Sequence, residues 1–125
     1  MKPRILVVDD DGEMRGFIIR CLKQKLSKKA EFFEAKNGLG ASEIFDAALT
    51  LVLTDCDMPE MNGLEFIKNI KGMPEYEDVP IIMLSGRDTE SDSEAAFTSG
   101  ANGFLAKPFT AETLLMKIKE VVPDL

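Results

Sequence analysis

The stretch Ile5-Leu6-Val7-Val8-Asp9 decides the fold class of this chain. Four consecutive apolar residues, with no polar alternation, are typical of a β-strand that is buried on both faces. Such strands occur in parallel sheets that are covered by helices on both sides. The change to aspartate at position 9 predicts that the strand ends there.

The same pattern returns along the chain. Apolar runs at 51–53 and 81–84 predict two more buried strands, and 32–33 and 104–105 predict two shorter ones. Asn37-Gly38 predicts a turn, and we expect Asp10 or Asp11, and later Thr110, to cap helices. Between the strands, apolar residues recur at helical spacing. The faces expected to be buried are Met14, Phe17, Ile18, Cys21, Leu22 and Leu26; Ala41, Ile44, Phe45, Ala48 and Leu49; Leu64, Ile67, Ile70 and Met73; Ala95, Ala96 and Phe97; and Ala111, Leu114, Leu115, Ile118, Val121 and Val122.

Five strand–helix units in succession predict an α/β fold with a doubly wound, five-stranded parallel sheet in three layers. We expect one domain over residues 1–125, because no linker, repeat or low-complexity tract divides the chain. The helix expected at 88–99 is mostly polar, so we predict that it is the least firmly packed of the five.

The composition excludes several classes of protein. Apolar residues make up 45% of the 125 positions, which argues against intrinsic disorder. The 15 basic and 22 acidic residues give a net charge of −7, which argues against binding to nucleic acid or to anionic membranes. No segment resembles a membrane span or a signal peptide, so we expect a soluble cytoplasmic protein.

The histidine and cysteine content excludes several further kinds of functional site. Histidine is absent, which excludes a Ser-His-Asp triad, a histidine base and a histidine metal site. Cys21 and Cys56 form no CxxC pair, which argues against a zinc knuckle or a dithiol redox centre. We expect both thiols to stay reduced.

Polar residues follow four of the expected strands. In open parallel sheets, ligands bind outside the carboxyl ends of the strands, so these residues are expected to converge at one edge. They are Asp9, Asp10 and Asp11 after the first strand, Asp55 and Asp57 at the end of the third, Ser85 and Gly86 at the end of the fourth, and Lys107 after the fifth.

These groups favour phosphoryl transfer with magnesium. Converging carboxylates repel one another unless a cation compensates, and Mg²⁺ binds one or two carboxylates while it shares oxygens with a phosphate. The spacing around Asp55 does not fit a calcium loop. A metal ion and a lysine can neutralise the charge on a transferred phosphoryl group. Asp55 is the best candidate for a covalent acceptor because it ends the middle apolar strand, while Asp9 and Asp10 suit a metal ion.

Four motifs stand in order along the chain, each at the end of an expected strand. They are Ile5-Leu6-Val7-Val8-Asp9-Asp10-Asp11; Leu53-Thr54-Asp55-Cys56-Asp57-Met58-Pro59 with Asn62-Gly63; Ile81-Ile82-Met83-Leu84-Ser85-Gly86; and Gly103-Phe104-Leu105-Ala106-Lys107-Pro108-Phe109. Together they resemble the receiver domain of two-component response regulators, of the single-domain type seen in chemotaxis regulators. The resemblance extends from about Lys2 to Val122 and implies a flavodoxin-like (βα)5 fold.

The resemblance implies a signalling switch rather than an enzyme. A histidine kinase or a phosphotransfer protein would donate a phosphoryl group, and small phosphodonors would also serve. Asp55 matches the phosphoacceptor, Asp10 the carboxylate that binds Mg²⁺ directly, and Asp9 the carboxylate that acts through water. The backbone carbonyl of Asp57 matches a further metal ligand. The output would be altered binding to a downstream protein effector, as a monomer or a phosphorylation-dependent dimer.

The resemblance also assigns the residues that respond to the phosphoryl group. Ser85 matches the hydroxyl residue that bonds it, and Lys107 matches the lysine that pairs with it. Phe104 matches the aromatic switch that turns inward when Ser85 moves, which alters the surface of the fourth helix, fifth strand and fifth helix. A cis peptide bond is expected at Lys107-Pro108. Asp57 and Arg87 occupy positions that the family varies to tune hydrolysis of the acyl phosphate.

Other interpretations stay open. The aspartates at 9–11 could simply cap a helix, Asp55 and Ser85 could close turns, and Phe104 could belong to the core. A phosphatase of the haloacid dehalogenase type also uses an aspartyl phosphate with an Asp two residues later, but on its first strand and in a longer chain. An unphosphorylated interaction scaffold is the third possibility, although such a domain would be expected to lose some of these residues. We expect a stand-alone regulator rather than a receiver from a larger protein.

Overall fold

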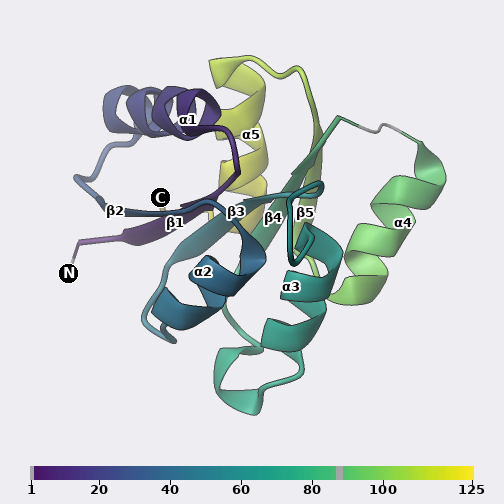
Figure 1. Ribbon diagram of the computed structural model, residues 1–125. Helices are drawn as coiled ribbons and strands as arrows, with labels where there is room; N and C mark the ends of the chain where they lie inside the picture. Colours follow the sequence, from purple (N-terminus) through teal and green to yellow (C-terminus); the bar gives the residue numbers. More distant parts are fainter. Residues whose placement is uncertain (1, 87–88) are drawn as a thin grey trace.

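The computed structural model describes residues 2–86 and 89–125. One parallel sheet in the order β2-β1-β3-β4-β5 forms the middle layer. Helices α1 and α5 cover one face, and α2, α3 and α4 cover the other (Figure 1). The elements are β1 (Arg4–Val8), α1 (Gly12–Lys25), β2 (Glu31–Ala35), α2 (Gly38–Ile44), β3 (Leu51–Asp55), α3 (Gly63–Lys71), a short 3-10 helix (Pro74–Tyr76), β4 (Ile81–Ser85), α4 (Glu90–Ser99), β5 (Gly103–Ala106) and α5 (Ala111–Val121).

The alternating side chains of the strands build two cores, one on each face of the sheet. On β1, Leu6 and Val8 face the helices α2 to α4, whereas Ile5 and Val7 face α1 and α5. All residues of β3 and β4 are buried, as expected for strands inside a doubly wound sheet. The predicted three-layer α/β fold is therefore confirmed, and its five strands lie where the apolar runs placed them.

The predicted helix around 41–49 is wrong in its extent. The Asn37-Gly38 pair starts α2 rather than forming a turn, because the Asn37 side chain accepts a hydrogen bond from the Gly40 N–H. The helix then ends at Ile44. Asp46 accepts a hydrogen bond from the Ala48 N–H at 2.7 Å, and this local bond competes with a further helical turn.

Five of the residues expected in the core are exposed instead. Met73 lies beyond the C-cap of α3, where the following proline prevents the helix from continuing. Phe97 is exposed on α4, so Ala96 is the one buried residue of this helix. This agrees with the prediction that α4 is the least firmly packed helix. The five exposed residues are Phe17, Ile44, Ala48, Met73 and Phe97.

Two predicted helix caps are confirmed. Asp11 caps α1 and Thr110 caps α5, each by accepting a backbone hydrogen bond. Cys21 and Cys56 are both free thiols. No helix in the described part of the chain is long and apolar enough to cross a membrane.

A close approach at Gly63 joins α3 to the end of β3. A Cβ atom at this position would lie 2.2 Å from the carbonyl oxygen of Asp55 and 3.0 Å from the Cα of Cys56. We expect Gly63→Ala to lower the free energy of unfolding by about 2 kcal/mol, because backbone must move to admit the methyl group. Urea unfolding measures the effect. Gly40→Ala is the control, since its Cβ would make ordinary contacts, and an equal loss in both variants would contradict the explanation.

Candidate functional site

The register of the sheet brings Asp9 and Asp55 together. Val8 of β1 pairs with Thr54 of β3, so the next residue of each strand lies at the same carboxyl edge. On the other side of β3, Asp55 pairs with Leu84, which puts Ser85 one residue further along β4. Ser85 in turn pairs with Ala106, and Lys107 follows directly.

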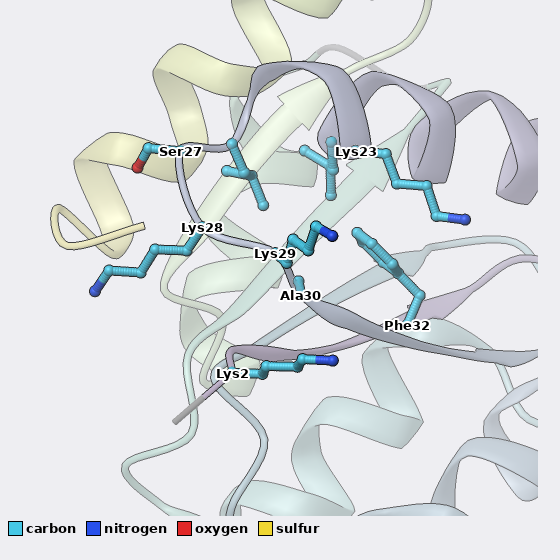
Figure 2. A pocket seen from close by; sticks show the side chains of 9 residues that line it. Lys2, Lys23, Ser27, Lys28, Lys29, Ala30 and Phe32 are labelled. Atoms are coloured by element: carbon cyan, nitrogen blue, oxygen red, sulfur yellow. The ribbon is translucent and has the colours of Figure 1, made fainter.

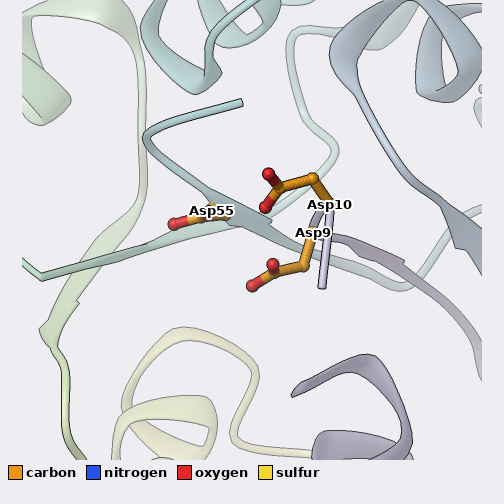
Figure 3. A group of neighbouring side chains, drawn as sticks. All are labelled: Asp9, Asp10 and Asp55. Carbon is orange, nitrogen blue, oxygen red and sulfur yellow. The ribbon is translucent and has the colours of Figure 1, made fainter. Parts of the chain in front are cut away.

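Three carboxylates converge at this edge. Figure 3 shows Asp9, Asp10 and Asp55 with their carboxylates directed to the same side. One oxygen from each lies within 4.8 Å of the others. Asp9 and Asp55 are buried, whereas Asp10 is exposed. A cluster of hard oxygen donors with one solvent-facing member fits a divalent cation that keeps part of its water.

Lys107 bridges the two buried carboxylates. Its Nζ lies 3.1 Å from Asp9 Oδ2 and 3.1 Å from Asp55 Oδ1. Burial by itself would lower the pKa of Lys107, but the hydrogen bonds and charges of Asp55 and Asp9 outweigh it and raise the pKa above its usual value. The ammonium group therefore stays charged and offsets part of the repulsion between the carboxylates.

The two oxygens of Asp55 differ in their surroundings. Oδ1 accepts hydrogen bonds from the Cys56 N–H at 2.9 Å and from Lys107. Oδ2 has no hydrogen bond to any described residue, so its lone pairs are available to an incoming group. Burial raises the pKa of Asp55, the Lys107 hydrogen bond opposes this, and the nearby Asp9 charge adds to the rise.

The other predicted site residues that the structure describes are Ser85, Asp57 and Phe104. Ser85 is buried, and its carbonyl oxygen accepts a hydrogen bond from the Lys107 N–H at 2.6 Å. Asp57 is exposed in the loop after β3, and Phe104 is partly buried against the core under α2 to α4. The expected cis bond at Lys107-Pro108 is present. Arg87 lies outside the described residues.

Arg15 supports the site, although the sequence patterns did not indicate it. Its guanidinium donates to the carbonyl oxygen of Asp9 at 2.6 Å and to the carboxylate of Glu34 at 3.0 Å. These bonds fix the start of the loop that carries Asp9 and Asp10. A basic residue in the first turns of a helix that follows an Asp-Asp pair was the available signal, but sequence spacing alone does not reveal a contact to a carbonyl.

We expect Arg15→Ala to lower the free energy of unfolding by about 1.5 kcal/mol, because the Asp9 carbonyl loses a charge-assisted hydrogen bond. Arg20, an exposed arginine on the same helix, provides the control. Arg20→Ala should stay within about 0.5 kcal/mol of the wild type. Denaturant unfolding of the two variants compares them, and equal stability would remove the anchoring role of Arg15.

The family of this chain follows from its sequence. A family model described as the response regulator receiver domain matches residues 5–119. The chain belongs to the response regulator receiver family. Within it, the receiver is 34% identical over 123 residues to a chemotaxis protein CheY homolog of Campylobacter jejuni, covering 95% of this chain and 92% of the relative. It is 37% identical over 123 residues to chemotaxis protein CheY1 of Helicobacter pylori, with 95% and 96% covered.

Solved structures agree with this assignment. The receiver superposes on chemotaxis response regulator CheY4 of Vibrio cholerae with a TM-score of 0.86 at 30% identity, covering 97% of this chain and 99% of the other. A CheY-like receiver domain protein from Methanospirillum hungatei gives a TM-score of 0.84 at 26% identity, with 99% and 96% covered. The predicted resemblance to receivers of the chemotaxis type is therefore confirmed.

Proposed function

We propose that this receiver is a phosphorylation switch in which Asp55 accepts a phosphoryl group. The single observation that carries the proposal is the environment of Asp55. Its carboxylate ends the middle strand, has one oxygen held by Lys107 and Cys56, and shares an edge with two further carboxylates. Family membership supports the same role, because receivers are signalling switches rather than classical enzymes.

In the proposed reaction, Asp55 Oδ2 attacks the phosphorus atom of the donor. The new bond joins that oxygen to phosphorus, and the bond from phosphorus to the donor breaks with its electron pair. The leaving group is the imidazole of a phosphohistidine on a kinase or phosphotransfer protein, or acetate when acetyl phosphate is the donor. Lys107 is placed to pair with the phosphoryl oxygens, because its ammonium already contacts the Asp55 carboxylate.

We propose Mg²⁺ as the cofactor, because the hard oxygens and the exposed member of the cluster suit it. Asp10 and Asp55 would bind it directly, Asp9 through water, and the backbone carbonyl of Asp57 would complete the protein ligands. When bound, the ion neutralises charge on the carboxylates and on the transferred group. Asp9 also holds the loop in place, since its Oδ1 accepts a hydrogen bond from the Asp11 N–H at 2.9 Å.

The proposed output is a change in the surface of α4, β5 and α5. A phosphoryl group adds negative charge and three acceptor oxygens beside Ser85 and Lys107. Ser85 moves toward these oxygens, and Phe104 follows into the space that Ser85 leaves. The thin packing of α4, with Ala96 alone buried, makes this helix a suitable two-state element. The downstream partner is a protein effector, and the similarity to chemotaxis proteins suggests one that controls motility.

We also propose that residues 1–125 act as one receiver domain. All five strands lie in one sheet. The haloacid dehalogenase alternative is disfavoured, because the Asp-x-Asp motif follows the third strand of this sheet rather than the first. The unphosphorylated scaffold is disfavoured because Asp9, Asp10, Asp55, Ser85 and Lys107 are all present at one edge.

The decisive test is labelling with acetyl phosphate and Mg²⁺, followed by intact mass measurement. We expect one added phosphoryl group on the wild type and none on Asp55→Asn. Asp57→Asn is the matched control, since it changes a neighbouring carboxylate but keeps the backbone carbonyl, and it should still be labelled. Equal labelling of Asp55→Asn and the wild type would refute the assignment of the acceptor.

A further inference from the structure

A hollow lies at the amino-terminal edge of the sheet, opposite the edge that holds Asp55. It has a volume of about 360 Å³ and lies between the end of α1, the loop that follows and the start of β2. Its apolar lining residues are Leu22, Leu26, Ala30 and Phe32. Figure 2 shows Ala30 and Phe32 among the lysines. This volume is in the range of sites that hold one small molecule.

The rim of this hollow is positively charged, although the protein is acidic. Lys2, Lys23, Lys28 and Lys29 line it, and no acidic residue does. The ten residues 20–29 carry five basic side chains and no acidic one, against a net charge of −7 for the whole chain. Among the described residues, none of these four lysines forms a salt bridge. Their charges are therefore available to an anion.

Positive charge and apolar surface lie side by side in this hollow. Lys23 Nζ is 6.0 Å from the centroid of the Phe32 ring. In Figure 2, Lys2, Lys23 and Lys29 extend toward the side of Phe32, whereas Lys28 points the other way. A ligand that fits both features carries two or more negative charges next to a flat apolar group. Lysine binds phosphate as a point charge, and an aromatic ring offers a stacking surface for a base.

We propose that this hollow, the lysine-rimmed pocket, binds a nucleoside phosphate. The negative charge of the whole chain disfavours a long polyanion such as nucleic acid, while a small anion meets only the local lysines. Asp124 lines an adjoining hollow that shares Lys2 and Lys28. Lys23 and Lys29 are therefore the principal phosphate-binding residues, and Phe32 is the stacking surface. The proposal is independent of the phosphorylation of Asp55.

The test is titration of ¹⁵N-labelled protein with ADP, followed by NMR in EDTA so that no metal recruits phosphate to the acidic cluster. We expect shifts in residues 22–32, unchanged signals at Asp9, Asp10 and Asp55, and a dissociation constant of about 0.1 mM or tighter. Lys23→Glu with Lys29→Glu should weaken binding about tenfold. The matched control, Lys68→Glu with Lys119→Glu, changes the same number of charges on exposed lysines of α3 and α5 and should bind as the wild type does.

Two further comparisons distinguish which chemical groups of the ligand the pocket binds. Phe32→Leu should weaken binding of ADP but leave binding of inorganic pyrophosphate unchanged, since only the base uses the ring. Absence of ADP-induced shifts at 22–32 would overturn the proposal. So would equal affinity for pyrophosphate and ADP, or binding of polyglutamate in place of ADP, because a polypeptide ligand would make this surface a protein-docking site.

Discussion

Lys107→Met is expected to lower the free energy of unfolding of the metal-free protein by about 3 kcal/mol. The substitution keeps the length and the apolar stem of the side chain but removes the ammonium that contacts Asp9 and Asp55 at 3.1 Å each. The two buried carboxylates would then face each other without a cation. Urea unfolding in EDTA measures the loss.

Mg²⁺ should restore most of the stability of Lys107→Met. A divalent ion at the carboxylate cluster supplies the positive charge that the variant lacks, so Mg²⁺ should stabilise it more than it stabilises the wild type. Lys107→Arg, which keeps the charge, is the control and should respond to Mg²⁺ as the wild type does. If Lys107→Met were as stable as the wild type in EDTA, Lys107 would not have the balancing role that we assign to it.

Asp55→Asn is expected to stabilise the metal-free protein while it abolishes phosphorylation. Burial raises the pKa of Asp55 in the fold, so its contribution to stability is fully present below the ordinary aspartate pKa of about 3.9 and is lost as the pH rises through the raised value. At pH 7 the ionised carboxylate therefore costs stability, and the neutral amide removes that cost. We expect a gain of about 1 kcal/mol at pH 7.

The gain from Asp55→Asn should shrink as the pH falls through the raised pKa of Asp55, and it should vanish below about 3.9, where the carboxyl group is protonated in the folded and the unfolded protein alike. The variant should also bind Mg²⁺ at least about 10- to 100-fold more weakly than the wild type. A loss of that size is already seen when a residue that only supports a metal ligand is replaced. Unfolding curves between acidic and neutral pH and calorimetric titration with Mg²⁺ measure the two effects. A variant that is less stable than the wild type at pH 7, or that binds Mg²⁺ equally well, contradicts this account of the site.

The sheet was predictable because its strands are buried on both faces. Runs such as Ile5 to Val8 have no polar alternation, and a parallel sheet is the structure that tolerates them. The position of the site followed from the same logic, since Asp9, Asp55 and Lys107 each stand where a parallel strand ends. Strand order and register then place these ends next to one another.

The helix ends and the supporting contacts were less predictable. Helical spacing extended the second helix to Leu49, but the hydrogen bond from the Ala48 N–H to Asp46 favours a loop after Ile44. Leu49 is still buried, so an apolar residue at helical spacing can reach the core from a loop. The contact of Arg15 with the Asp9 carbonyl depends on the direction of a long side chain, which no residue pattern encodes.

The most direct measurement is the anomalous signal of Mn²⁺, used in place of Mg²⁺, in a crystal of the wild-type receiver. We predict a single strong peak at the carboxyl edge of the sheet, within ligand distance of Asp10 and Asp55 and close to the Asp57 carbonyl. A peak away from this edge, or carboxylates at 9, 10 and 55 that stay unliganded at a saturating concentration of the ion, would contradict the claim that these residues share one metal ion.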